Sequence, residues 1–188
     1  MKSVLITIRP QWVEKIASGE KTIEVRKTAP QEVPFKCYIY ETKGQYVKFT
    51  HGAHTKYGYG RGKVIGEFIC DRIICSQAYF DSQGKNHLTN VFPDDIKKTC
   101  LDEYDLWDYI AGKAVKANQM YDGYLWHISD LKIYDKPREL SEFRKPCDRF
   151  LDCCTCRRLV HNEYMSCDNK ITRPPLSWCY VEDLGEEE

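Results

Sequence analysis

The stretch IRPQWVEKIASGEKTIEVR, residues 8–26, combines the two periodicities that decide the fold. Pro10 suits the first turn of a helix and Gly19 suits the position just after its end, so the spacing predicts a short helix between them. Residues 21–26 then alternate polar and apolar side chains, as is typical of a strand. The sequence therefore predicts a short helix followed by a half-buried strand.

The polar face of this predicted strand carries the main candidate site. Glu24 and Arg26 point to the same face, and Lys21 lies at the turn before them. A desolvated lysine can act as a base or a nucleophile, and a guanidinium can hold a phosphate or carbonyl oxygen with two hydrogen bonds. The same spacing also fits a surface ion pair of little energetic value, so the residues alone leave a ligand site and a structural pair open.

The rest of the chain adds mostly strands. We expect further strands at residues 4–8, 35–42, 64–74 (with a bulge at Gly66), 124–134 and 177–181, and a second helix at 101–109. Several strands with few helices predict an α+β protein built on a small mixed β-barrel.

The composition excludes some classes of function. The 188 residues contain 28 Lys+Arg and 28 Asp+Glu, so no overall charge attracts a polyanion and any nucleic-acid affinity must be local. No apolar run is long enough to span a bilayer. The apolar run at the N-terminus is short and is closed by Arg9 and Pro10, which does not fit a signal peptide, so we expect a cytoplasmic protein.

The motif Gly19-x-Lys21-x-x-Glu24-x-Arg26, preceded by residues 8–12 (IRPQW), resembles the signature of the ASCH family in the PUA-like superfamily. The resemblance covers residues 1–136, and with the C-terminal tail the whole chain is similar to ASCH proteins of phages and gut Firmicutes. It implies a PUA-like β-barrel with a cleft lined by the motif, and a role with RNA or a modified nucleoside or nucleotide.

The resemblance leads to a set of candidate ligand-binding residues, which are Arg9, Trp12, Lys21, Glu24, Arg26 and Trp178. In this hypothesis Arg26 and Lys21 meet an oxyanion, Glu24 accepts a hydrogen bond from a base or ribose, and Trp12 or Trp178 flanks the cleft as a stacking surface.

Some ASCH proteins are amidohydrolases acting on acylated cytidine, which gives an enzymatic alternative. Here Lys21 is the candidate activated group, with Glu24 or Glu103 as proton carrier in the hydrolysis of an acylated nucleoside or of RNA. These enzymes have a threonine three residues after the motif lysine, where this chain has Glu24. Asp102 competes with Glu103 for the position of their later glutamate. A third hypothesis is a phage-encoded adaptor that binds a host protein.

Residues 42–66 contain no acidic residue. They interleave basic residues, which follow phosphates, with aromatic rings, which stack on bases, and this is the composition that single-stranded nucleic acid requires. A soluble glycine-rich loop without a function explains the same composition. We therefore predict a loop here and leave both interpretations open.

Six of the ten cysteines fall in the last quarter of the chain. Clustering of this kind, in a chain without an export signal, favours metal ligation over disulfides. We predict a structural Zn²⁺ held by Cys153, Cys156, Cys167 and Cys179, with Cys147, Cys154 and His161 as rival ligands. The sequence thus predicts a barrel domain at 1–136 and a metal-stabilised C-terminal extension at 137–188.

Overall fold

The computed structural model describes residues 2–51, 54–113, 115–116, 119–146, 159–160, 163–164 and 169–185. One sheet contains β1 (Ser3–Ile8), β3 (Phe35–Glu41), β6 (Val64–Cys70), β10 (Ser129–Arg138) and β13 (Trp178–Val181), and its strand order is β10-β6-β3-β1-β13. We call it the first sheet. The second sheet contains β2 (Ile23–Arg26), β7 (Ile73–Phe80), β8 (Asn86–Leu88) and β9 (Tyr121–His127), in the order β2-β9-β7-β8.

Short elements complete the described part. These are the helices α1 (Pro10–Ala17), α2 (Pro93–Thr99) and α3 (Glu103–Ala111), the 3₁₀ turn η1 (Leu140–Glu142), and the hairpins β4 (Gly44–His51) with β5 (His54–Gly60) and β11 (Leu159–Val160) with β12 (Glu163–Tyr164). None of the described helices has the length and apolar character needed to cross a membrane.

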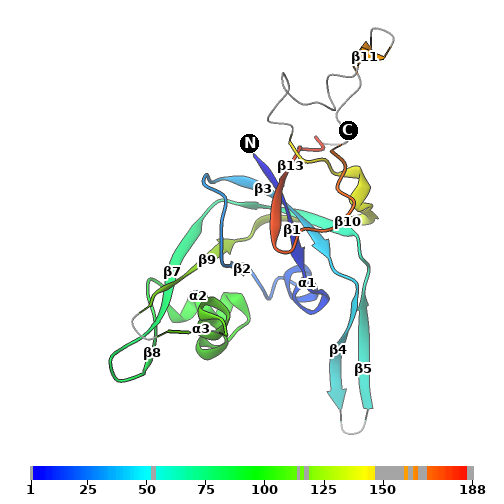
Figure 1. The fold of residues 1–188 in the computed structure, drawn as a ribbon. Helices are drawn as coiled ribbons and strands as arrows, with labels where there is room; N and C mark the ends of the chain where they lie inside the picture. The colour runs from blue at the N-terminus through cyan, green and yellow to red at the C-terminus, as the bar shows by residue number, and fades with distance from the viewer. Residues whose placement is uncertain are drawn as a thin grey trace.

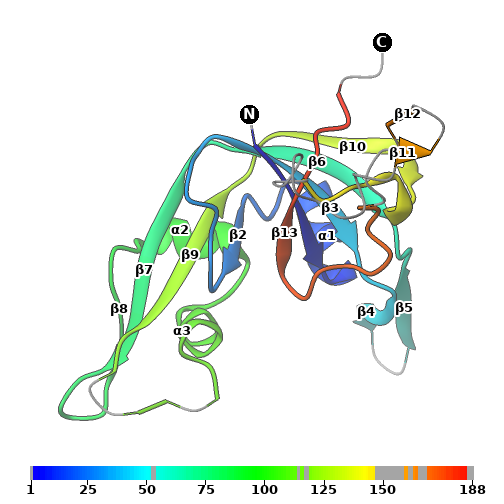
Figure 2. The ribbon, with the colours of Figure 1, turned by 45° about the horizontal axis from the view of Figure 1, so that its top comes forward.

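At two places a strand of one sheet is followed, after only one or two residues, by a strand of the other sheet (Figure 2). The strand predicted at 64–74 bends at Asp71 and Arg72, which separates β6 from β7. The strand predicted at 124–134 bends in the same way at Ile128, between β9 and β10. The prediction of a barrel is wrong in one respect: the sheet edges β10 and β13 do not pair with β2 or β8 among the described residues, so no closed barrel forms.

The predicted bulge at Gly66 is confirmed. Ile39 lies opposite Gly66 while the next residue, Tyr40, lies opposite Val64, so β6 has an extra residue at this point. A Cβ atom on Gly66 would lie 2.5 Å from the carbonyl oxygen of Lys132. The glycine therefore lets β10 approach β6 closely where β6 is bulged.

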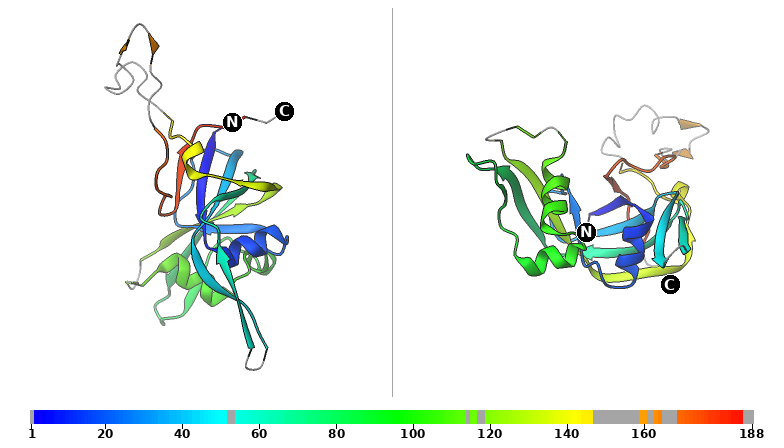
Figure 3. Two further views of the ribbon diagram at one scale, coloured as in Figure 1. Left: turned by 90° about the vertical axis from the view of Figure 1, so that its right-hand side faces the viewer. Right: turned by 90° about the horizontal axis from the view of Figure 1, so that it is seen from below.

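The helices cover different parts of the core, as the view from below shows (Figure 3). Val13 and Ile16 of α1 pack into the apolar cluster that the first sheet dominates. Leu106 and Ile110 of α3 pack instead against the second sheet. Trp12 of α1 and Asp105 and Asp108 of α3 line the space between the two helices.

Residues after position 137 complete the first sheet and its core. β13 pairs antiparallel with β1, with Ser3 opposite Val181. Phe143 is 0% exposed, and its ring centroid lies 4.9 Å from that of Tyr38 in an edge-on contact. β10 itself runs to Arg138, so the sequence-based boundary at 136/137 falls within a strand.

An ion pair joins the two bends. The Nδ1 atom of His127 lies 2.6 Å from Oδ1 of Asp71, and the backbone N–H of His127 donates to the carbonyl oxygen of Arg72 at 2.9 Å. The hydrogen bond with His127 lowers the pKa of Asp71. A carboxylate with a lowered pKa stabilises the fold above its unfolded pKa of about 3.9, and this contribution disappears as the pH falls through the folded pKa.

We expect Asp71→Asn to lower the free energy of unfolding by about 0.2–1 kcal/mol at pH 6, a small value because the carboxylate is 50% exposed and screened by water. The difference from the wild type should shrink towards zero as the pH falls through the lowered pKa of Asp71, because the carboxylate itself is then protonated. Urea unfolding between pH 2 and 7 measures it, with Asp135→Asn on the exposed side of β10 as a control. A difference that does not change with pH would contradict this role of the pair.

Candidate ligand-binding site

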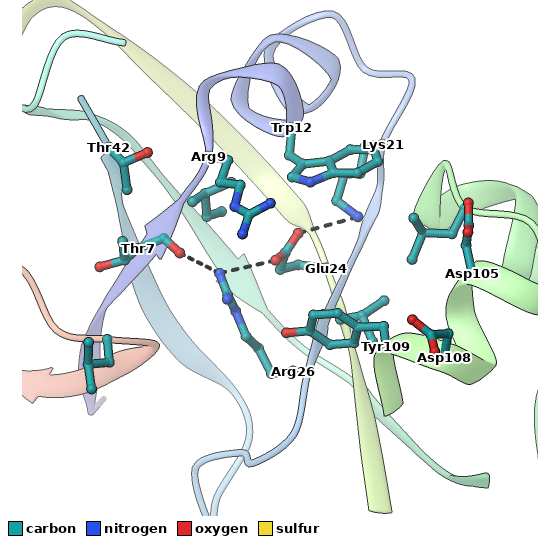
Figure 4. A pocket seen from close by; sticks show the side chains of 14 residues that line it. Thr7, Arg9, Trp12, Lys21, Glu24, Arg26, Thr42, Asp105, Asp108 and Tyr109 are labelled. Carbon is teal, nitrogen blue, oxygen red and sulfur yellow. Dashed lines mark hydrogen bonds and ion pairs between the residues drawn. The ribbon is translucent and has the colours of Figure 1, made fainter. Parts of the chain in front are cut away.

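A cavity of about 620 Å³ lies between α1 and α3. It is lined by Thr7, Ile8, Arg9, Trp12, Lys21, Glu24, Val25, Arg26, Thr42, Leu101, Asp105, Asp108, Tyr109 and Leu176 (Figure 4). We call this cavity the cleft. It contains five of the six residues predicted to bind the ligand, and ten of its fourteen lining residues are charged or carry a hydroxyl group or an indole.

Local structure explains why the motif faces the cleft. Gly19 has a φ of 79°, which reverses the chain after α1, and the N–H of Lys21 then donates to the carbonyl oxygen of Lys15. In β2 the side chains of Ile23 and Val25 pack into the core of the second sheet. Because side chains alternate along a strand, Glu24 is presented on the opposite face, in the cleft.

The three charged motif residues form one buried cluster. Glu24 lies between two cations: its Oε2 is 3.3 Å from Nζ of Lys21, and its Oε1 is 3.1 Å from Nη2 of Arg26. The exposed fractions are 3% for Lys21, 6% for Glu24 and 9% for Arg26. The sequence left a surface ion pair open as an interpretation, and this burial excludes it.

Lys21 is fixed by several contacts. Its Nζ donates to the carbonyl oxygens of Ile23 at 2.9 Å and Thr99 at 2.7 Å, and it also faces Glu24. It lies 5.3 Å from the ring centroid of Trp12. Two of its three possible donors are thus used by backbone carbonyl oxygens, and the ion pair with Glu24 adds a further contact. Lys21 is therefore placed to support the site electrostatically.

Some polar atoms of the cluster have no hydrogen-bond partner within it. Arg26 donates through Nη2 to the carbonyl oxygen of Thr7 at 2.6 Å. Its Nε, however, has no hydrogen-bond partner among the described residues, and neither does Oε2 of Glu24 despite its ion pair. Buried polar atoms are nearly always paired in folded proteins. Both residues line the cleft, so the cluster keeps unused hydrogen-bonding capacity at its wall.

The opposite wall is acidic and comes from α3. Asp105, Asp108 and Tyr109 are three and four residues apart, so they share the helix face that is turned towards the cleft (Figure 4). Burial raises the pKa of Tyr109, although the nearby guanidinium of Arg26 opposes this effect. The cleft is therefore polarised, with cations around Glu24 on one side and two carboxylates on the other.

The sequence did not single out the acidic wall. The predicted Glu103 lies on an exposed part of α3 and does not line the cleft, and Asp102 caps the helix by accepting from the N–H of Asp105 at 2.7 Å. The spacing of Asp105 and Asp108, opposite the apolar face of α3, was the available signal. The catalytic role of Glu103 stays a prediction, without support from its position.

Trp178 also lies away from the cleft. Its ring packs edge-on against Trp126, with centroids 5.8 Å apart, and its Nε1 donates to Oγ1 of Thr28 at 3.0 Å. The rim on this side is formed by Leu176, which is fully exposed. Of the two tryptophans considered as stacking surfaces, only Trp12 lines the cleft.

The predicted zinc ligands are only partly described. Cys153, Cys156 and Cys167, like the rivals Cys147, Cys154 and His161, lie outside the described residues. Cys179 on β13 packs against the core of the first sheet, and burial raises its pKa, which favours the thiol over the thiolate that zinc binds. No group of three or more metal-ligating side chains occurs in the described part of the chain. The zinc site stays a prediction, which elemental analysis of the purified protein measures.

Known structures share this arrangement of strands and helices. No family model and no curated protein matches the sequence. The crystal structure of ASCH from Zymomonas mobilis aligns with a TM-score of 0.51 and 17% identity, over 96% of this chain and 88% of that chain. The chain has an ASCH-type fold. A single-residue variant of the Zymomonas mobilis protein aligns over 97% of this chain and 91% of its own, with a TM-score of 0.50 and 16% identity.

The ASCH-type fold confirms the architecture that the motif suggested, without the closed barrel. At 17% identity the likeness shows the fold alone. The function of this chain must therefore be argued from its own cleft.

Proposed function

We propose that the ASCH-type cleft binds a nucleoside or nucleotide unit, either of RNA or of a modified nucleoside. The observation that carries this proposal is the buried cluster of Lys21, Glu24 and Arg26 at the wall of the cleft. It offers a carboxylate acceptor directly beside a guanidinium donor. The volume of about 620 Å³ lies within the range of small-ligand sites, roughly 300–1,000 Å³.

A nucleotide matches the polarity of the cleft. The edge of a base presents hydrogen-bond donors and acceptors side by side, so Glu24 accepts from an amino group while Arg26 donates to a carbonyl or phosphate oxygen. Ribose hydroxyls are donors that suit Asp105 and Asp108 on the opposite wall. Trp12 provides a ring against which a base can stack.

Binding has more support than catalysis. The hydrolase alternative requires Lys21 as the activated group, but its Nζ donates to the carbonyl oxygens of Ile23 and Thr99 and is paired with Glu24. The carboxylate of Glu24 occupies the position at which the known hydrolases have a hydroxyl group. A protein adaptor remains the third hypothesis, and no contact in the cleft favours it.

We expect Arg9→Gln to weaken nucleoside monophosphate binding by about tenfold or more, because a hydrogen bond to a charged group contributes roughly 1.5–3 kcal/mol. Arg9 lines the cleft and is exposed, so its replacement should leave the fold intact. Calorimetric titration with CMP, UMP, AMP and GMP measures the affinities, and Arg173→Gln, at an exposed arginine outside the cleft, is the matched control.

The same titrations decide between the alternatives. If none of the four nucleotides binds, or if both arginine variants lose affinity equally, the proposed function is wrong. Chromatography after incubation with N4-acetylcytidine tests turnover, and we expect the compound to be recovered unchanged. Its complete deacylation would instead favour the hydrolase.

A further inference from the structure

The hairpin of β4 and β5 projects from the body of the molecule beside α1 (Figure 1). We call it the arm. The sequence suggested a loop here, but residues 44–51 and 54–60 pair as antiparallel strands. A Cβ atom on Gly60 would collide with Pro10 and with the carbonyl oxygen of Thr42. Glycine thus lets the base of the arm lie against the start of α1, and Thr42 lines the cleft, so the arm begins at the edge of the cleft.

The arm has one packed face and one open face. On the packed face the ring of Tyr46 covers Gly58, and Lys48 forms an ion pair of 2.6 Å with Glu14 of α1. The open face carries Val47 opposite Tyr57, and Tyr59 two residues further along β5.

The open face is apolar and accessible. Val47 is 54% exposed, Tyr57 is 49% exposed and Tyr59 is 70% exposed. Adjacent exposed rings of this kind typically mark an interaction surface. The two tyrosines lie on the same face of one strand, as stacking platforms for successive bases do.

The arm and its flanking residues carry charge of one sign. Residues 42–66 contain five lysines and arginines and no acidic residue, in a chain with no net charge. Lys48 and Lys63 form ion pairs with Glu14 and Glu139 of other segments. Lys43, Lys56 and Arg61 are exposed. A basic surface with accessible aromatic rings is complementary to a polyanion whose bases are unpaired. A protein partner would be drawn to the rings, but the one-sided charge favours nucleic acid.

We propose that the arm binds a single strand of nucleic acid, and that one nucleotide of the same strand occupies the cleft. This inference rests on the proposed function and names its ligand as a polymer rather than a free nucleoside. The arm then contributes affinity along the strand through base stacking and phosphate contacts, while the cleft selects one nucleotide.

The test measures the affinity of the full-length chain for two probes. One is a labelled twelve-nucleotide RNA without secondary structure, and the other is UMP, the matching mononucleotide. Fluorescence anisotropy should show that Tyr57→Ser/Tyr59→Ser weakens RNA binding by at least tenfold. Calorimetry should show unchanged UMP affinity, within twofold. Phe92→Ser, which removes another exposed ring (72% exposed) on α2's side of the molecule, is the matched control and should bind RNA like the wild type.

A second pair of variants tests the charge without touching the rings. Lys43→Gln and Arg61→Gln should each reduce the slope of log affinity against log salt by about one. Circular dichroism and melting curves establish that all variants keep the fold.

The outcomes separate the arm from the cleft. Wild-type RNA affinity no greater than UMP affinity, or RNA binding that Tyr57→Ser/Tyr59→Ser leaves unchanged, overturns the role of the arm while the cleft proposal stands. The cleft proposal is overturned instead if UMP does not bind and RNA binding depends on the arm but not on Arg9. If neither RNA nor UMP binds, both the arm proposal and the cleft proposal are wrong. Capture of a protein that depends on Tyr57 and Tyr59 would then identify the open face as a protein-binding surface.

Discussion

Replacement of the central carboxylate by an amide, Glu24→Gln, should lower the free energy of unfolding by about 3–5 kcal/mol. The carboxylate is buried between Lys21 and Arg26, at 3.3 Å and 3.1 Å. The amide leaves both cations buried without a negative partner, and this desolvated charge is the cause of the loss. Urea unfolding followed by tryptophan fluorescence at pH 7 measures the effect.

Two comparisons identify the cause of this loss. Glu20→Gln removes a carboxylate with the same chemistry, but its ion pair with Lys15 is exposed and 3.8 Å long, so a change below about 1 kcal/mol is expected. The triple variant Lys21→Met/Glu24→Leu/Arg26→Met removes all three charges and should be more stable than Glu24→Gln. A triple variant as unstable as the single one would show that unpaired charge is not the reason.

Phe143→Ala should also lower the free energy of unfolding by about 3–5 kcal/mol. The ring is completely buried in an apolar cluster that also contains Leu5, and it packs edge-on against Tyr38. Its removal leaves a cavity between the C-terminal segment and the first sheet. Thermal and urea unfolding of the full-length chain measure the loss.

Phe92→Ala is the matched control, because the same chemical change is made on a ring that is 72% exposed. A change within about 0.5 kcal/mol is expected there. If Phe143→Ala had as small an effect, the residues after position 137 would pack on the sheet without stabilising it. The large effect would instead make them an integral part of the ASCH-type core.

The cationic side of the cleft could be predicted because its residues are neighbours in the sequence. Strand alternation fixes the face of Glu24 and Arg26, and Gly19 fixes the turn that brings Lys21 beside them. The acidic side comes from α3, about eighty residues away along the chain, and its meeting with β2 depends on how the two sheets are placed. No local pattern contains that information.

Two elements were missed for local reasons. The arm was predicted as a loop because its glycines weaken the strand signal, although Gly58 and Gly60 are needed for Tyr46 and α1 to pack closely. Helix α2 is only seven residues long and lacks a clear apolar face, yet Pro93 at its start and the acidic first turn were usable signals. The bend at Ile128 escaped prediction because the strand pattern continues through it.

Those two bends determine more than the topology. Thr7, Trp12 and Thr42 line the cleft from the first sheet and α1, whereas Glu24 and Asp105 line it from the second sheet and α3. The two bends are the shortest connections between these halves, so a change in either bend would change the angle between the sheets and the width of the cleft. Substitutions at Asp71 or Ile128 would thus alter ligand affinity from a distance. They would change the width of the cleft without changing the residues that line it.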